Sequence, residues 1–187
     1  PKPRASQPSA PSEPSAPRAQ RAATVPGMLA MARLVERQGD LAKAEGMYRG
    51  ILANDPMHTV ALHRMGVVVA KRGQYELSAS LLEKAVTYDP RNAELLADLG
   101  HTYYQLERPE ESEKYLRQAL RLNPHDEVAR NNFAMVLAVQ RRNEEALAEF
   151  RKVGTEAEAH ASLSFVLRQI GEVDAANQHY ETAMSLN

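Results

Sequence analysis

The stretch AVTYDPRNAE, residues 85–94, contains the pair Asp89-Pro90, and the same kind of pair recurs on both sides of it. The others are Asp55-Pro56 and Asn123-Pro124, so the three prolines are spaced 34 residues apart. A period of this length is typical of stacked helix-turn-helix units, in which each unit buries its apolar face against the next. Because proline cannot continue a helix, each pair marks the end of a second helix. The period predicts an all-α array.

The array can be divided into units by placing the recurring proline at place 32 of each. The units are then 25–58, 59–92, 93–126, 127–156 and 157–187. Small residues coincide at places 8 and 20, where two antiparallel helices can approach closely. Place 8 holds Ala32, Gly66, Gly100, Ala134 and Ser164, and place 20 holds Ala44, Ser78, Ser112, Ala146 and Ala176.

Large apolar residues coincide at other places of the same units, among them places 7 and 24. Place 7 holds Met31, Met65, Leu99, Phe133 and Leu163, and place 24 holds Tyr48, Leu82, Leu116, Phe150 and Tyr180. We expect these side chains to fill the space around the close helix contact and to reach the next unit. Leu99 is expected to be deeply buried between the second and third units.

The turns carry further helix signals. Gly39, Gly73 and Gly171 lie between the two helices of their units, where a left-handed residue commonly ends a helix. Pro109 is expected to open a second helix, because the first helical position does not need its missing N–H group.

The fourth unit has only 30 residues, and the deletion falls after Phe150. Its second helix is expected to be about one turn shorter, ended by Gly154, with a change in superhelical pitch. Thr155 and Glu158 have the spacing of a capping box for the next helix. The alternative is a deletion without functional consequence.

This pattern of small and large residues resembles the tetratricopeptide repeat family across residues 25–187. The resemblance implies a right-handed α-solenoid of about five antiparallel helix pairs. It also implies that the first helices line a concave groove that holds extended peptides or helices. The tryptophan frequent at place 4 of that family is absent here, where Met28, Leu62, Leu96, Arg130 and His160 stand.

Residues 1–24 differ from the array. Proline and serine alternate through this segment, and no large apolar side chain precedes Val25. Such a composition cannot bury enough surface to offset its ordering entropy, so it predicts a disordered tail or linker. A spacer role is favoured over a Pro-rich ligand.

Composition excludes several classes of function. The chain has 187 residues, a formal net charge of −1 and no cysteine. Nonspecific nucleic-acid binding needs an excess of Lys and Arg, and thiolate chemistry needs cysteine. No apolar run approaches the roughly 20 residues that span a bilayer, so no membrane insertion is predicted. The compartment stays open: the cytoplasm or, if an upstream signal was removed, the periplasm or the exterior.

Catalytic motifs are also absent from the sequence. None of the six histidines sits in a metal-binding motif or beside a second ligand at a useful spacing. No glycine-rich phosphate loop and no nucleophile elbow occur. We therefore predict no catalytic residue, no metal and no cofactor, and a chain that is not an enzyme.

The inward places that the resemblance implies define a candidate groove. Its N-terminal half is rich in cations, which suit carboxylates through paired hydrogen bonds. Its later part offers apolar contacts, and two asparagines can bond a peptide backbone. The candidate residues are Arg33, Arg37, Arg64, Lys71, His101, Tyr104, Asn131, Asn132, Met135, Phe165 and Arg168. Arg64 and Asn132 are the strongest candidates, because both occupy the central place 6.

We therefore predict a scaffold that binds another protein's peptide or helix, with acidic residues docked toward the first unit. Two alternatives remain: a substrate-docking repeat region of a larger enzyme resembling protein O-glycosyltransferases, or a bacterial secretion or pilus assembly factor. The lysine and asparagine that bind chaperone tails in some relatives are not matched. No polar capping helix follows the fifth unit, which ends at Asn187, so the chain is expected to be a fragment or to form a homodimer through its last helix.

Overall fold

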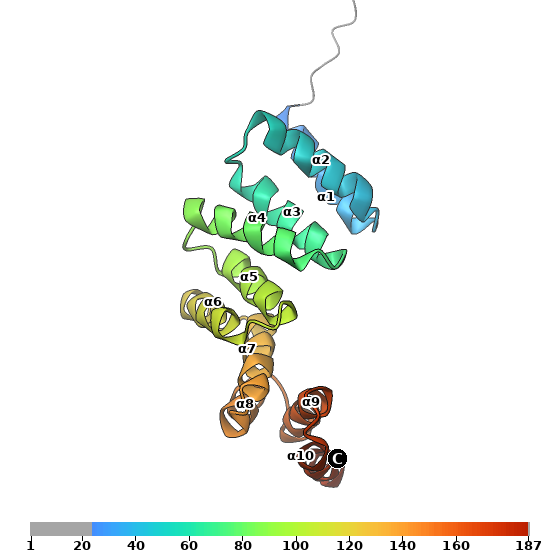
Figure 1. Cartoon of the computed structure of the whole chain (residues 1–187), viewed down its shortest axis with the longest axis vertical. Helices are drawn as coiled ribbons and strands as arrows, with labels where there is room; N and C mark the ends of the chain where they lie inside the picture. The colour runs from blue at the N-terminus through green and yellow to red at the C-terminus, as the bar shows by residue number, and fades with distance from the viewer. Residues whose placement is uncertain (1–23, 187) are drawn as a thin grey trace, which may run out of the picture.

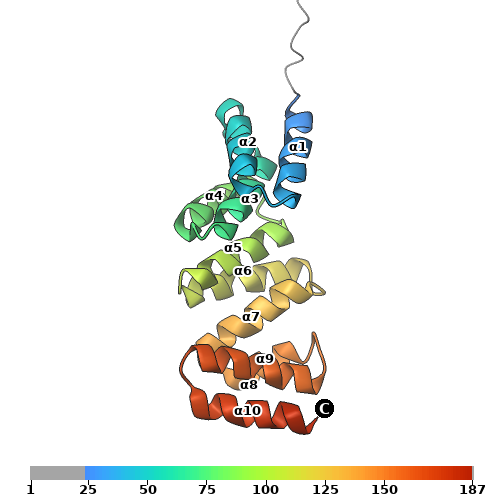
Figure 2. The same ribbon diagram turned by 90° about the vertical axis from the view of Figure 1, so that its right-hand side faces the viewer.

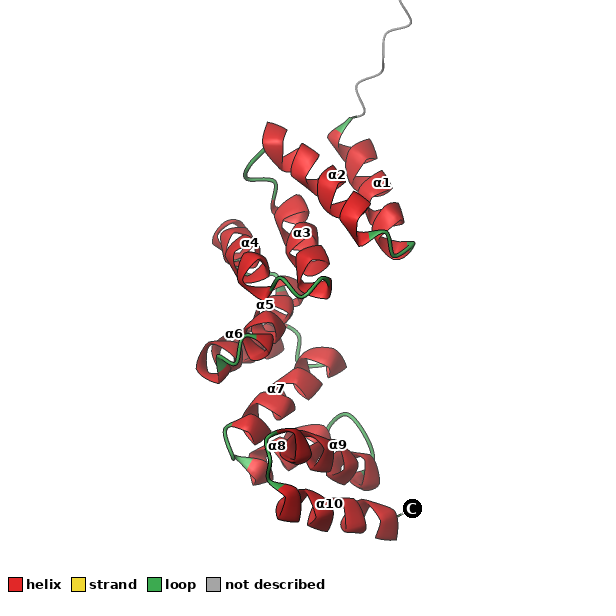
Figure 3. Cartoon of the chain, turned by 45° about the vertical axis from the view of Figure 1, so that its right-hand side comes forward, coloured by secondary structure: helices red, strands yellow, loops and turns green. Residues whose placement is uncertain are grey.

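The computed structural model describes residues 24–186, which contain ten α-helices and no strand (Figures 1 and 3). The helices are α1 Val25–Arg37, α2 Leu41–Asn54, α3 Thr59–Lys71, α4 Tyr75–Tyr88, α5 Ala93–Gln105, α6 Pro109–Leu122, α7 Glu127–Val139, α8 Asn143–Phe150, α9 Glu156–Gln169 and α10 Val173–Ser185. They form five antiparallel pairs stacked into an elongated array (Figure 2). This confirms the predicted all-α solenoid. The predicted tail lies outside the described residues except for Thr24, whose side chain caps α1.

Small residues set the close approach of the two helices in each pair, as predicted. A β-carbon added to Gly100 would lie 2.6 Å from the Cγ of Leu116, and one added to Gly66 would lie 2.8 Å from the Leu82 side chain. At the same level, the hydroxyl of Ser112 donates to the backbone carbonyl of Gly100 at 2.6 Å. Places 8 and 20 therefore accept little beyond glycine, alanine or serine.

Two large residues depart from the predicted core. Met31 of α1 and Tyr180 of α10 are 50% and 53% exposed, whereas their equivalents Leu99 and Leu116 are fully buried. The prediction that places 7 and 24 are buried is wrong for these two. Both lie on terminal helices of the described array, so no neighbouring pair covers them.

The turn within each pair uses a left-handed residue at the same place. Gly39, Gly73 and Gly171 have φ of 84°, 76° and 84°, which confirms the prediction for glycine. The equivalent positions in the third and fourth pairs are Glu107 and Arg141, with φ of 56° and 63°. A side chain in this region costs roughly 1–2 kcal/mol. The repeat geometry therefore imposes this conformation even where glycine is missing.

The fourth pair is shortened in its second helix, as predicted. α8 has 8 residues, whereas α2, α4 and α6 have 14 each. The shortening exceeds the predicted single turn, because the helix ends at Phe150 and a non-helical turn precedes Gly154. Thr155 and Glu158 form the expected capping box, and α9 begins at Glu156. α9 contacts both α7 and α8, and Figure 1 shows the last pair set to one side of them.

None of the helices in residues 24–186 combines the length and the apolar character needed to cross a bilayer.

Candidate partner-binding groove

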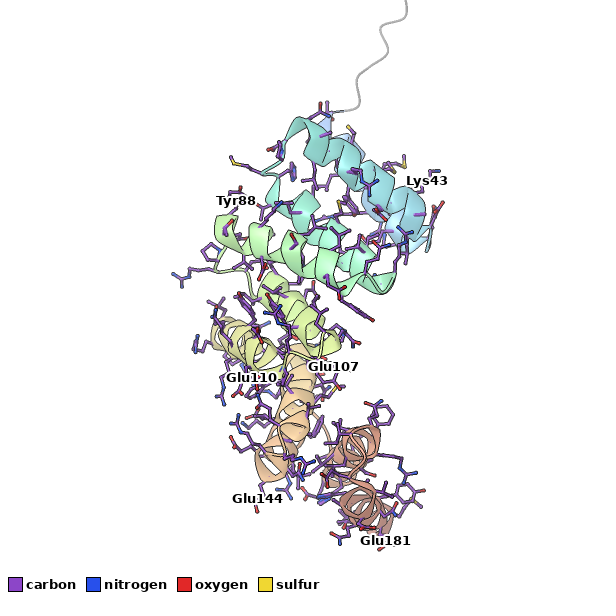
Figure 4. The ribbon with its side chains drawn as sticks, in the orientation of Figure 1. Lys43, Tyr88, Glu107, Glu110, Glu144 and Glu181 are labelled. Carbon is purple, nitrogen blue, oxygen red and sulfur yellow. The ribbon has the colours of Figure 1, made fainter. Side chains whose placement is uncertain are left out.

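Three hollows are lined mainly by the first helices of the pairs. The N-terminal hollow, about 330 Å³, is lined by Arg33, Glu36, Arg37, His63, Arg64 and Glu94. The central hollow, about 320 Å³, is lined by Val67, Ala70, Lys71, Tyr75, Leu82, Asp98, His101 and Thr102. The apolar cleft, about 510 Å³, is lined by Tyr104, Gln105, Glu107, Pro109, Met135, Val139, Gln169 and Ile170. We call the three together the groove; Figure 4 labels Glu107, at the turn between α5 and α6.

A buried carboxylate organises the N-terminal hollow. Glu36 of α1 is only 6% exposed. It accepts hydrogen bonds from both Nε and an Nη atom of Arg64, from the Tyr48 hydroxyl at 3.0 Å and from Lys71 Nζ at 3.4 Å. The bidentate contact joins α1 to α3 and fixes the guanidinium plane. Four side chains thus form one network across the first two helix pairs.

The pKa values in this network follow its geometry. Burial acts to raise the pKa of Glu36, but the hydrogen bonds and charge of Arg64 outweigh it and hold the pKa below its ordinary value of 4.5. Burial and the Glu36 carboxylate raise the pKa of Tyr48 to about 12. Glu36 is therefore ionised at neutral pH and neutralises Arg64.

This network changes the roles of the predicted cations. Arg64, one of the two strongest candidates, is engaged with Glu36 instead of facing a partner freely. Arg33 and Arg37 are exposed in the same hollow, and the Lys71 side chain remains 53% exposed. The sequence analysis did not predict the contact between Glu36 and Arg64. The alignment of units could have suggested it, because Glu36 occupies place 12 of the first unit and Arg64 occupies place 6 of the second.

The central hollow meets the N-terminal hollow at a histidine–carboxylate cluster. His63 of α3 is 7% exposed, and its Nε2 lies 2.7 Å from Oδ2 of Asp98 on α5. Glu94 lies one helical turn before Asp98 and contacts Arg64 at 3.7 Å. The prediction that no histidine stands beside a second ligand is wrong here, because stacking brings together residues 35 positions apart.

His101 is also part of this hollow. Its Nδ1 is buried and has no hydrogen-bond partner among the side chains and backbone of residues 24–186. Its ring stacks on that of Tyr104, with centroids 6.4 Å apart. Burial lowers the pKa of His101, while the nearby Asp98 acts to raise it, so this imidazole favours its neutral form.

The apolar cleft lies between α5, α7 and α9. Tyr104 and Met135 contribute one half-buried side chain each, as the groove prediction places them, and Val139 and Ile170 add apolar surface. Burial raises the pKa of Tyr104, so its hydroxyl remains protonated and can donate a hydrogen bond. The cleft therefore combines an apolar wall with the Tyr104 hydroxyl and with the polar side chains of Gln105 and Gln169.

The remaining candidates lie apart from these hollows. Asn131 and Asn132 are half-buried on α7, and neither lines one of the three. Phe165 on α9 is 61% exposed. Arg168 is also exposed and donates to the side-chain oxygen of Asn177 at 3.0 Å. The structure thus gathers Arg33, Arg37 and Arg64 in one hollow, Lys71 and His101 in a second, and Tyr104 and Met135 in a third.

A second histidine pair joins the two helices of the last pair. Nδ1 of His160 on α9 lies 2.8 Å from Nδ1 of His179 on α10, and Nε2 of His160 lies 3.3 Å from the Glu156 carboxylate. A carboxylate only accepts, so Nε2 of His160 carries the proton of its contact with Glu156. Burial first, and then His160, lower the pKa of His179 below 6.5.

The His160–His179 bond should make the last pair sensitive to acid. The unfolded chain takes up the His179 proton before the folded chain does, so this contribution is complete above pH 6.5 and is lost as pH falls through the lowered pKa. We expect His179→Gln to reduce the acid-induced loss of stability by about 1 kcal/mol, comparable to one hydrogen bond. Thermal unfolding between pH 7.5 and 5.5 measures it, with His125→Gln as control. Equal pH slopes for His179→Gln and the parent would contradict this assignment.

Comparison with known sequences gives a consistent result. Two models, each described as a tetratricopeptide repeat, match residues 69–119 and 97–161. The TPR repeat-containing protein PA4667 of Pseudomonas aeruginosa is 34% identical over 97 residues, which are 51% of this chain and 16% of that protein. Protein FlbA of Caulobacter vibrioides is 25% identical over 162 residues, 84% of this chain and 27% of that protein. The chain thus spans less than a third of either relative.

Solved structures share the architecture. YrrB, described as a TPR protein with an unusual peptide-binding site, superposes with a TM-score of 0.70 at 25% identity and covers 86% of this chain and 85% of its own. MamA superposes with a TM-score of 0.67 at 20% identity and covers 82% of this chain and 92% of its own. The likeness to MamA shows the fold alone.

Proposed function

Since this chain belongs to the tetratricopeptide repeat family, whose fold serves as a scaffold for protein interactions, we propose that its groove binds a segment of another protein without catalysing a reaction. The observation that carries the proposal is the apolar cleft between Tyr104 and Met135. Its volume, about 510 Å³, falls in the range of roughly 300–1,000 Å³ typical of ligand sites. A peptide-binding site in the similar protein YrrB supports the same reading.

The cleft fits a large apolar side chain of the partner. Val139 and Ile170 lie on the walls beside Met135, whose flexible thioether adapts to differently shaped groups. The Tyr104 hydroxyl adds a donor for a backbone carbonyl at the edge of the cleft. An anchor residue seated here would provide most of the binding energy, as central buried residues do at interfaces.

The N-terminal hollow sets the charge of the partner. Arg33 and Arg37 are exposed there, and Glu36 neutralises Arg64 behind them. We therefore assign carboxylate binding to Arg33 and Arg37, with Lys71 beyond them, and assign Arg64 to shaping the hollow. The partner segment would then carry acidic residues toward α1 and an apolar anchor toward α7 and α9.

A peptide-display selection with random peptides tests this proposal. We expect selected peptides to combine acidic residues with a large apolar residue. Met135→Ser should weaken their binding by about tenfold or more, because it removes the apolar wall of the cleft. Arg33→Ala/Arg37→Ala should flatten the salt dependence, since those cations act through screened charge.

The matched control is Lys43→Ala/Arg121→Ala, which removes two exposed cations from the second helices α2 and α6. It should bind like the parent at every salt concentration. Selected peptides that bind the Met135 and double-arginine variants as tightly as the parent would place the binding surface elsewhere.

A further inference from the structure

We propose that His63, Glu94 and Asp98 form a binding site for a divalent transition-metal ion, with Zn²⁺ as the best-fitting ion. The three residues offer one imidazole nitrogen and two carboxylate oxygens, and these ligand atoms all lie within 4.8 Å of one another. They come from two adjacent pairs of the array, His63 from α3 and the two acids from α5. A nitrogen and two carboxylates are a donor set that zinc accepts.

The geometry requires only small side-chain movements. Ligands bound to a tetrahedral zinc at about 2.0–2.1 Å are separated from each other by about 3.3 Å. His63 Nε2 and Asp98 Oδ2 are 2.7 Å apart, so they must separate slightly and let the ion replace the proton between them. The Asp98 and Glu94 side chains are 37% and 71% exposed, which leaves their rotamers room to adjust. His63 is buried on the α3 side and provides the fixed ligand.

The two carboxylates share one face of α5. Glu94 and Asp98 are four positions apart, which stacks their side chains one turn above the other toward α3. His101, three positions further, lines the central hollow together with Asp98 and has its buried Nδ1 free of protein partners within residues 24–186. Nitrogen and oxygen donors thus gather along one short segment of the groove.

The neighbouring charges permit a cation. Arg64 lies 3.7 Å from Glu94, but it is bonded in bidentate fashion to Glu36, which compensates its charge. Glu94 and Asp98 then balance a divalent ion. The other cations of the adjoining hollows, Arg33, Arg37 and Lys71, are exposed, so water and salt screen their repulsion of the ion. The contact between Arg64 and the exposed Glu94 is of the kind that contributes little in water, so it competes weakly with metal coordination. Three protein ligands leave one position open to water or to a partner's carboxylate.

Metal titration of the purified chain tests the site. Isothermal titration with Zn²⁺ and visible absorption with Co²⁺, in buffer free of chelators, should show saturable binding of one ion. His63→Gln and Asp98→Asn should each weaken that binding by more than about tenfold. Zn²⁺ should also raise the melting temperature of the parent, because the ion binds only the folded arrangement of α3 and α5.

His179→Gln is the matched control, since it disrupts the other histidine pair and should leave this affinity unchanged. Circular dichroism checks that each variant is folded. If His63→Gln unfolds, Asp98→Asn still tests the site, because the Asp98 side chain is more exposed than that of His63 and its substitution disturbs the packing less. Three results would overturn the proposal: no saturable binding at micromolar metal, equal binding by folded His63→Gln or Asp98→Asn, or binding lost in His179→Gln. Because metal binding needs no peptide, failure here leaves the peptide-selection result untouched.

Discussion

Leu99→Ala is expected to lower the free energy of unfolding by about 2–5 kcal/mol. Leu99 is fully buried on α5 and belongs to the same buried cluster as Val69 and Leu82 of the preceding pair. Its truncation removes apolar contacts on both sides of a junction and leaves a cavity that the stacked helices cannot easily close. Urea unfolding followed by far-UV circular dichroism measures the loss.

Leu77→Ala is the matched control, because Leu77 on α4 is 39% exposed and its truncation should cost well under about 1 kcal/mol. If Leu99→Ala were no more destabilising than Leu77→Ala, the alignment of units on which the whole fold interpretation depends would be wrong.

Glu36→Gln is expected to cost about 3 kcal/mol, near the lower end of the effect of breaking a buried ion pair. The variant keeps the shape of the side chain but removes the charge that compensates Arg64 and weakens the bond from Tyr48. The cost stays near the lower end because the Arg64 side chain is 23% exposed and keeps partial access to water. Thermal and urea unfolding at pH 7 measure it.

The pH dependence of this variant provides an independent check. The folded pKa of Glu36 is lowered, so its contribution is complete above the ordinary value of 4.5 and is lost as pH falls below it. The stability difference between the parent and Glu36→Gln should therefore shrink on acidification. The triple change Glu36→Leu/Arg64→Leu/Tyr48→Phe should recover much of the loss, since it leaves neither a charge nor the buried Tyr48 hydroxyl without a partner. A Glu36→Gln variant as stable as the parent at pH 7 would contradict the network.

The fold could be predicted well from the sequence because every repeat unit needs the same residue types at the same places, so each unit provides a separate test of the alignment. A small residue at places 8 and 20 is needed in every pair, and Gly66 and Gly100 show why, since neither leaves room for a β-carbon. The exceptions have local causes. Met31 lies on a terminal helix, and Glu107 adopts the left-handed turn without glycine because packing imposes it.

The candidate site was predicted less completely, because pairing between side chains depends on which contacts prevail after stacking. The exposed arginines and the cleft residues Tyr104 and Met135 follow from their places in the repeat. The ion pair between Arg64 and Glu36, 28 positions apart, could not be predicted from these places, because Arg64 also lies within reach of a second carboxylate, Glu94. The places in adjacent units identify which residues can be neighbours. Arg64 makes its bidentate hydrogen bonds to the buried Glu36 and only a longer contact to the exposed Glu94.

Stacking by neighbours alone also determines how the molecule would respond to tension. Each helix pair packs chiefly on the pairs before and after it, so pulling on the two ends loads the junctions in series. Small changes in the angle between adjacent helix pairs add up along the array. The array can therefore lengthen while the apolar side chains at each junction remain packed. At the junction after the eight-residue α8, α9 contacts α7 as well as α8, so the longer α7 would share the load with the shortened helix.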